Sequence, residues 1–160
     1  MATEIFLKIG DIKGESVAKG HENEINVTSW NWGMTQAAGL KSASGAAMGK
    51  VQVQDIAISK LVDKSSPTLM LACCGGKRYP DATLVMRKTG TKPIEYLKII
   101  MRDVMVSSVA VGTSSDQDRV AENITLGFAE FKVEYTPQNK DGSAGTVTAA
   151  GWNIVKSVKL

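Results

Sequence analysis

The sequence contains one histidine, His21, which is the first candidate for acid–base or metal chemistry. Both kinds of chemistry use histidine, but each needs suitable partner groups close to the ring. His21 lies in the segment GHENEI, a turn that leads into a strand pattern, and this turn supplies no evident partner. The sequence therefore predicts that His21 fixes the turn through a hydrogen bond.

The two cysteines, Cys73 and Cys74, are adjacent. A disulfide between neighbours would close a strained eight-membered ring, and a metal site would need further ligands, whereas His21 is far away in sequence. We favour the interpretation that both are small residues at the end of a helix in a reducing compartment. A redox switch made of the two neighbouring thiols stays open as the alternative.

The remaining candidates for chemistry are weak. The carboxylate pairs Glu22/Glu24 and Asp116/Asp118 lie in loop-like surroundings, where solvated surface is expected. The runs GMTQAAGL and GAAMGK resemble phosphate-binding loops only loosely, because neither is followed by Lys-Ser/Thr and a helix. The sequence predicts no catalytic residue, no cofactor and no metal ion, and therefore no enzyme.

Composition narrows the class of protein further. With 160 residues, 43% hydrophobic and 22% charged, the chain fits a single globular domain spanning residues 1–160. The net charge of +3 is too mild to indicate nucleic acid as a partner. Apolar runs such as TLMLACC fall far short of the roughly 20 residues of a membrane-spanning helix. The N-terminus lacks the pattern of a signal peptide, so synthesis and initial retention in the cytoplasm are expected.

Most of the chain shows the alternation of apolar residues that is typical of β-strands. Strands are predicted at residues 3–11, 24–33, 50–62, 82–88, 95–111, 122–137 and 151–160. In three of them the apolar residues change face part-way, for example from Leu97, Ile99 and Met101 to Val104 and Val106. Such a change indicates a bulge or a sharp bend, and Gly127 beside one of the changes suits a tight bend. The predicted fold is therefore mainly β, with strands that turn corners into a β-barrel.

One helix interrupts the strands. Ser66 is the expected N-cap, Pro67 the first helical residue and Gly75 the residue just past the end. Spacings of three and four residues predict a short buried face formed by Leu69, Met70, Ala72, Cys73 and Cys74. The segments 34–51, 112–119 and 137–152 are predicted to be exposed connections.

The segment EINVTSWNWG contains Trp30 and Trp32 with Asn31 between them. A strand that buries both indoles on one face must turn Asn31 to the other face. Alternation alone leaves open whether Asn31 meets water, a substrate or another copy of the protein.

Several longer blocks, taken together, resemble one known family. The blocks are IFLKIGDIKGES, GHENEINVTSWNWG, VQVQDIAISKLVDKSSPTLMLACCGGKRYPDATLVMRKTG, YLKIIMRDVMVSSVAVG, ENITLGFAEFKVEYTPQ and GWNI. In this order they are similar to the hemolysin-coregulated protein (Hcp) family of the bacterial type VI secretion system, over nearly the whole chain.

The resemblance implies a phage tail-tube-like fold, a β-barrel of two sheets with one flanking α-helix. It implies homohexameric rings that stack into a hollow tube, which is tipped by a spike and expelled from the cell by a contractile sheath. The spike protein and the sheath and baseplate components are therefore expected partners. It also implies small effector proteins as cargo in the lumen, export through the type VI apparatus, and no insertion into membranes.

The resemblance also suggests residue roles. Asn31 would face the lumen and contact effectors, although it could equally be an ordinary solvent-facing strand residue. Residues of a long loop would contact the neighbouring ring or subunit, unless that loop is simply disordered in the isolated ring: Gly39, Leu40, Lys41, Ser42, Met48 and Gly49. Two other functions remain open, a phage-type tail tube without a secretion role and a monomeric barrel that binds a small molecule.

Overall fold

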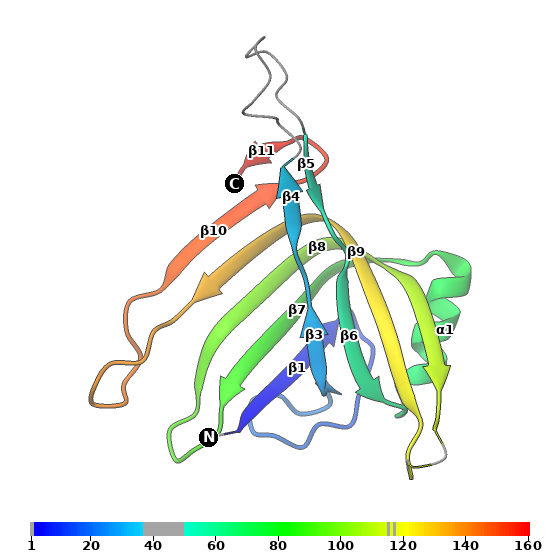
Figure 1. Ribbon diagram of the computed structural model, residues 1–160, viewed down its shortest axis with the longest axis horizontal. Helices are drawn as coiled ribbons and strands as arrows, with labels where there is room; N and C mark the ends of the chain where they lie inside the picture. Colours follow the sequence, from blue (N-terminus) through cyan, green and yellow to red (C-terminus); the bar gives the residue numbers. More distant parts are fainter. Residues whose placement is uncertain (1, 37–49, 115, 117) are drawn as a thin grey trace.

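The computed structural model describes residues 2–36, 50–114, 116 and 118–160, and within them the chain forms eleven strands and one helix (Figure 1). Their bounds are β1 (Thr3–Ile9), β2 (Ile25–Val27), β3 (Ser29–Asn31), β4 (Met34–Gln36), β5 (Val51–Val53), β6 (Ile56–Leu61), α1 (Ser66–Gly75), β7 (Arg78–Lys88), β8 (Ile94–Gly112), β9 (Ala121–Tyr135), β10 (Thr148–Asn153) and β11 (Val158–Lys159). No described helix has the length and apolar character needed to cross a membrane.

Nine of the described strands form one antiparallel sheet, and β4 and β5 form a second, small one. The main order is β11-β10-β9-β8-β7-β1-β2, and β6 pairs with β9 on one side and with β3 on the other. β9 therefore changes neighbour along its length, from β6 in its first half to β10 in its second.

The large sheet curls around the core but is not closed as a barrel by strand pairing (Figure 1). β2 and β3 follow each other in the chain, and β2 pairs with β1 while β3 pairs with β6. Thr28 joins them and donates its backbone N–H to the Ser59 carbonyl at 2.8 Å. The predicted class, mainly β with two sheets and one helix, is confirmed, whereas the predicted closure is incomplete.

The three long strands all change face along one line, which is formed by Pro80 in β7, Asp103 in β8 and Ala129 in β9. Pairing on either side fixes this alignment: Tyr79 with Val104, Asp81 with Arg102, Arg102 with Glu130, and Val104 with Phe128. Asp103 has φ 55°, a left-handed conformation that is uncommon outside glycine. We refer to this line as the corner, and it confirms the bends predicted within 95–111 and 122–137.

The other predicted features of these strands need correction. Gly127 lies beside the corner, and a Cβ there would also lie 3.3 Å from the Asp55 Oδ1 atom, closer than an ordinary contact. The change of face within 50–62 separates two strands, where the chain leaves the small sheet as β5 and enters the large one as β6. β7 begins four residues earlier than predicted, at Arg78, and β10 takes up part of the predicted connection 137–152.

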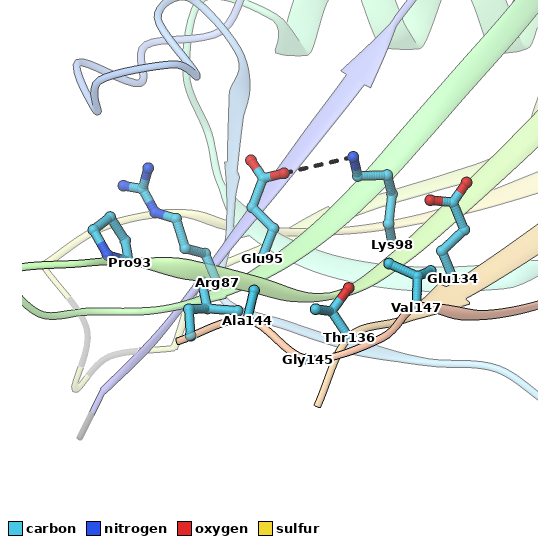
Figure 2. A pocket seen from close by; sticks show the side chains of 10 residues that line it. Arg87, Pro93, Glu95, Lys98, Glu134, Thr136, Ala144, Gly145 and Val147 are labelled. Carbon is cyan, nitrogen blue, oxygen red and sulfur yellow. Dashed lines mark ion pairs between the residues drawn. The ribbon is translucent and has the colours of Figure 1, made fainter. Parts of the chain in front are cut away.

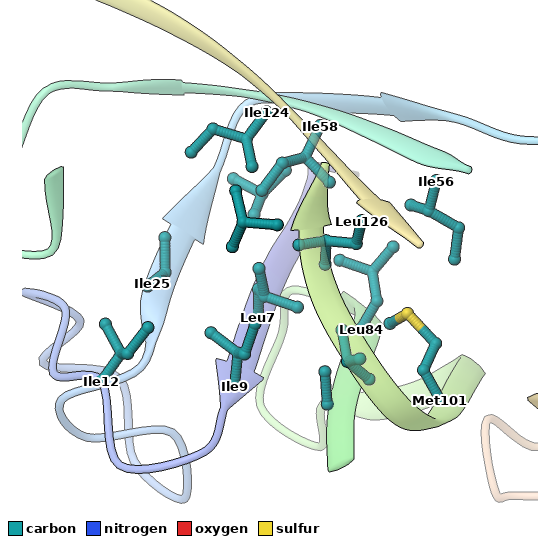
Figure 3. Close-up of a cluster of buried hydrophobic side chains, with 14 of the residues drawn as sticks. Leu7, Ile9, Ile12, Ile25, Ile56, Ile58, Leu84, Met101, Ile124 and Leu126 are labelled. Carbon is teal, nitrogen blue, oxygen red and sulfur yellow. The ribbon is translucent and has the colours of Figure 1, made fainter. Parts of the chain in front are cut away.

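The core lies inside the curled sheet and receives side chains from both halves of it (Figure 3). Fully buried members include Leu7, Ile25, Ile56, Leu84, Met101 and Ile124. Burying each such side chain stabilises the fold by about 1.5–3 kcal/mol. The inward faces of the described strands are therefore filled by their own side chains.

The helix is one residue longer at each end than predicted. Ser65 is the N-cap, Gly75 is the last helical residue, and Gly76 ends the helix in a left-handed conformation with φ 61°. Leu69 and Ala72 are buried and Cys73 is half-buried, as predicted. Met70 and Cys74 are exposed, because α1 docks on the sheet through a strip narrower than the predicted face.

Candidate functional site: a polar sheet face

The outward face of β3, β6, β9 and β8 carries small side chains in register, most of them polar. One row across the four strands runs Asn31, Ala57, Thr125 and Ser108, and the next runs Ser29, Ser59, Asn123 and Ala110. All eight residues are exposed or half-buried. We call this set, together with the adjoining Asp55, Ser107 and Gly127, the polar face.

Hydrogen bonds link most of these side chains to one another. Ser59 Oγ donates to Asn123 Oδ1 at 2.7 Å, and the Ser108 and Thr125 hydroxyls are 2.6 Å apart. Ser107, which bulges out of the β8–β9 register, donates to Asp55 Oδ2 at 2.5 Å and lies 2.7 Å from the Thr125 hydroxyl. These groups are held in fixed positions, so they present an ordered array of donors and acceptors.

Asn31 differs from its neighbours, because its exposed carboxamide has no side-chain hydrogen bond among the described residues. Trp30 and Trp32 point the other way and pack, half-buried, against the core, as the alternation predicted. Trp32 Nε1 donates to the Gln54 carbonyl at 2.7 Å, and its ring meets Phe131 edge-on at 4.9 Å. The strand is thereby anchored from the inside while Asn31 is free to contact another molecule.

Charge is distributed differently on the two sides of the corner. Within the polar face, Asp55 is the one ionisable residue. Beyond the corner, the register brings Arg102 between Asp81 and Glu130 and pairs Lys98 with Glu134. The polar face can therefore form hydrogen bonds with a partner, but it offers no acid–base pair or nucleophile of the usual catalytic type.

His21 does make the predicted hydrogen bonding, in a larger arrangement than expected. Its Nδ1 lies 3.0 Å from Glu24 Oε1 and its Nε2 lies 2.6 Å from Glu95 Oε1. The ring is 6% exposed and stacks on Phe6 with centroids 4.4 Å apart. Glu95 follows 74 residues later in the chain, and no local pattern could have identified it as a partner.

The carboxylate pairs and the cysteines are only partly as predicted. Glu22, Asp116 and Asp118 are exposed, but Glu24 is half-buried against His21. Backbone N–H groups of Glu22 and Gly20 lower the pKa of the Glu22 carboxyl. Both cysteines are free thiols. The loop candidates Gly39, Leu40, Lys41, Ser42, Met48 and Gly49 lie outside the described residues.

A buried charged cluster escaped the sequence interpretation. Lys60 Nζ donates to Glu122 Oε2 at 2.6 Å, to Asp63 Oδ1 at 3.1 Å and to Ser66 Oγ at 3.2 Å. Lys60 and Glu122 are 1% and 0% exposed, and they pair directly across β6 and β9. The sequence did contain a signal for the burial of Lys60, because alternation places it on the same inward face as Ile56 and Ile58. The cluster ties β6 and β9 to the start of α1.

Comparison with known proteins adds the family. Residues 6–135 match the sequence profile described as "Type VI secretion system effector, Hcp". The chain is 48% identical to Protein hcp1 of Pseudomonas aeruginosa over 161 residues, covering 99% of each. Its fold is similar to that of Hcp1 from Salmonella typhimurium, with 36% identity, a TM-score of 0.84 and 100% of both chains covered.

A type VI secretion effector from Yersinia pestis is also similar in structure, with 31% identity and a TM-score of 0.77 over 94% of this chain and 99% of that one. A structure described as a type six secretion system protein has a TM-score of 0.93 at 26% identity, covering 99% of this chain and 100% of that one. The sequence and the fold agree: the chain belongs to the Hcp family of the type VI secretion system.

Proposed function

We propose that this protein is the tube subunit of a type VI secretion system, with a structural and carrier role in place of an enzymatic one. Six copies form a ring, rings stack into a hollow tube, and the polar face lines the channel. The tube assembles in the cytoplasm, in contact with spike, sheath and baseplate components, and leaves the cell through the apparatus. Small effector proteins travel in the lumen.

The polar face is the observation that carries this proposal. Its side chains are small and mostly linked to each other, and they include the single ionisable residue Asp55. A channel that holds a folded cargo and then releases it needs contacts that are numerous but individually weak. Hydrogen bonds that exchange with water contribute only about 0.5–1.5 kcal/mol each, which suits such reversible contact.

Open strand edges are consistent with assembly into rings. Among the described residues, β3 pairs only with β6, and β8 from Val106 to Gly112 pairs only with β9. These two edges bound the four strands of the polar face. An exposed edge is prone to pair with another chain, and a head-to-tail contact with a suitable rotation closes a ring. The same edges would extend the polar face from one subunit to the next.

Asn31→Trp tests the channel assignment. The indole would project from the polar face into the channel, so rings should form normally while retention of a co-expressed small effector falls at least about ten-fold, equivalent to about 1.4 kcal/mol. Effector retained per ring is measured by size-exclusion chromatography and quantitative mass spectrometry. Lys8→Trp is the matched control, because Lys8 is exposed on β1, away from the polar face. Equal retention by both variants and the unmodified protein would refute the role of Asn31.

A further inference from the structure

The segment between β1 and β2, residues 10–24, is buried in the core at Ile12 and covers Phe6 on the outer side of the sheet with the ring of His21. We call it the strap. Within it, Gly14 N–H donates to the Asn23 carbonyl at 2.7 Å and Ser16 N–H to the Glu24 carbonyl at 3.0 Å. A side chain at Gly14 would place its Cβ 2.4 Å from the Glu24 carbonyl oxygen, so the two arms of the strap touch directly.

Side-chain hydrogen bonds connect the strap to three other parts of the chain. Glu15 Oε2 accepts the Lys64 N–H at 2.9 Å, before α1, and Arg87 Nη1 of β7 donates to the Lys19 carbonyl at 3.0 Å. His21 reaches Glu95 of β8. The tie through His21 differs from the other two because its side chain is buried. His21 is 6% exposed, and its ring covers Phe6, which is 2% exposed.

The donors and acceptors around His21 depend on its protonation. Carboxylate oxygens accept from Nδ1 at 3.0 Å and from Nε2 at 2.6 Å. A neutral imidazole has one N–H donor, whereas the doubly protonated ring has two. Both contacts can therefore be hydrogen bonds to carboxylates only while the ring carries its second proton. Loss of that proton would set a nitrogen lone pair against one of the two carboxylates.

The charged surroundings of His21 come from every element packed against it. Glu24 is on the strap and Glu95 on β8, and Figure 2 shows Glu95 directed toward Lys98, whose Nζ lies 3.5 Å from Glu95 Oε2. Beneath the ring, the Arg87 guanidinium lies 5.1 Å from the Phe6 centroid and is paired with Glu4 at 2.7 Å. Lys19 and Glu22 are neighbours along the strap. Of these groups, the Glu24 and Glu95 carboxylates are the two in direct contact with the ring.

We propose that the strap is a proton-sensitive device: His21 docks it on β8 when doubly protonated and loosens it when the ring becomes neutral. This inference goes beyond the proposed tube function. The direction follows from the contacts, because both carboxylates accept hydrogen bonds from the ring only while both ring nitrogens carry a proton, so docking is firmer at low pH than at high pH. Loosening would uncover Phe6 and the start of the β8 strand.

Hydrogen–deuterium exchange read by mass spectrometry tests this in the full-length protein. Protection of peptides within residues 13–24, corrected for intrinsic exchange, should fall about ten-fold or more between about pH 5.5 and about pH 8.5. Helix α1 should show no comparable change. Since the chain has one histidine, no other imidazole contributes.

Glu95→Gln separates the protonation effect from a merely structural role. A glutamine can donate to or accept from the ring, so the strap should stay docked with little dependence on pH. Glu24→Gln is the second variant, in case the first does not fold, and it should also flatten the pH profile. Protection of residues 13–24 that is independent of pH in the unmodified protein, or an unchanged pH profile in the folded variant, would overturn the proposal.

Discussion

At the scale of single residues, the least expected feature is a pair of opposite charges at core positions. Lys60 and Glu122 are fully buried, and Glu122 Oε1 has no hydrogen-bond partner in the part of the chain that the structure describes. Such pairs add little net stability compared with well-packed apolar residues, because both charges lose their hydration. Removing one partner is far more costly, since the other charge is left behind in the core. We therefore interpret the cluster as a device that fixes how α1 meets β6 and β9.

Substitution of Glu122 by leucine should accordingly be severe. Glu122→Leu leaves the Lys60 ammonium buried with only Asp63 as a counter-charge, and we expect a loss of about 3–5 kcal/mol in the free energy of unfolding. The double variant Lys60→Met/Glu122→Leu should recover most of this loss. Urea denaturation followed by tryptophan fluorescence measures both, and a double variant no more stable than Glu122→Leu would contradict this interpretation.

At the scale of elements, the corner determines which residues each long strand presents. The inward-facing residues of β8 change alternation at the corner, between Met101 and Val104. At the same place, the outer side of the sheet changes from charged side chains to the polar face. Asp103 is the residue of the corner with a positive φ, and its ion pair with Arg78 is exposed. Surface pairs of this kind contribute little, so backbone conformation is the main demand at this position.

Asp103→Val should therefore destabilise the protein by about 1–2 kcal/mol, because a β-branched side chain tolerates the left-handed region poorly. Asp103→Asn keeps a residue that adopts this conformation more readily and should change stability by less than about 0.5 kcal/mol. Thermal unfolding of the two variants gives the comparison. Equal midpoints would mean that the left-handed conformation of Asp103 carries no significant cost.

These elements also show what a sequence can and cannot predict. Alternation located most strands, and the changes of face around Asp103 and Ala129 located the corner, because both are local properties of the chain. The partners of β9 were beyond reach, since β6 and β10 share its edge through pairings that are distant in sequence. Our prediction began the helix one residue too late, at Pro67, because Ser66 does not cap the helix: its Oγ donates to Glu122 at 2.6 Å. Asn31 was predicted to be outward-facing, but its neighbours on the polar face depend on register.

At the scale of the whole molecule, the curled sheet has a filled interior and two unlike outer surfaces. The polar face suits a channel wall, and the charged half beyond the corner suits contact with water or with oppositely charged neighbours. A net charge of +3 per chain produces only modest repulsion between copies in a ring. Function in this account depends on assembly, because a single copy exposes the polar face and its open strand edges to solvent.

The central claim is therefore tested most directly by the mass of the purified protein in solution. Multi-angle light scattering should give six times the chain mass of 17.1 kDa, and negative-stain electron microscopy of the same fraction should show rings with an open centre. A species with the mass of one chain at every concentration measured, without rings in the images, would contradict the proposed tube function.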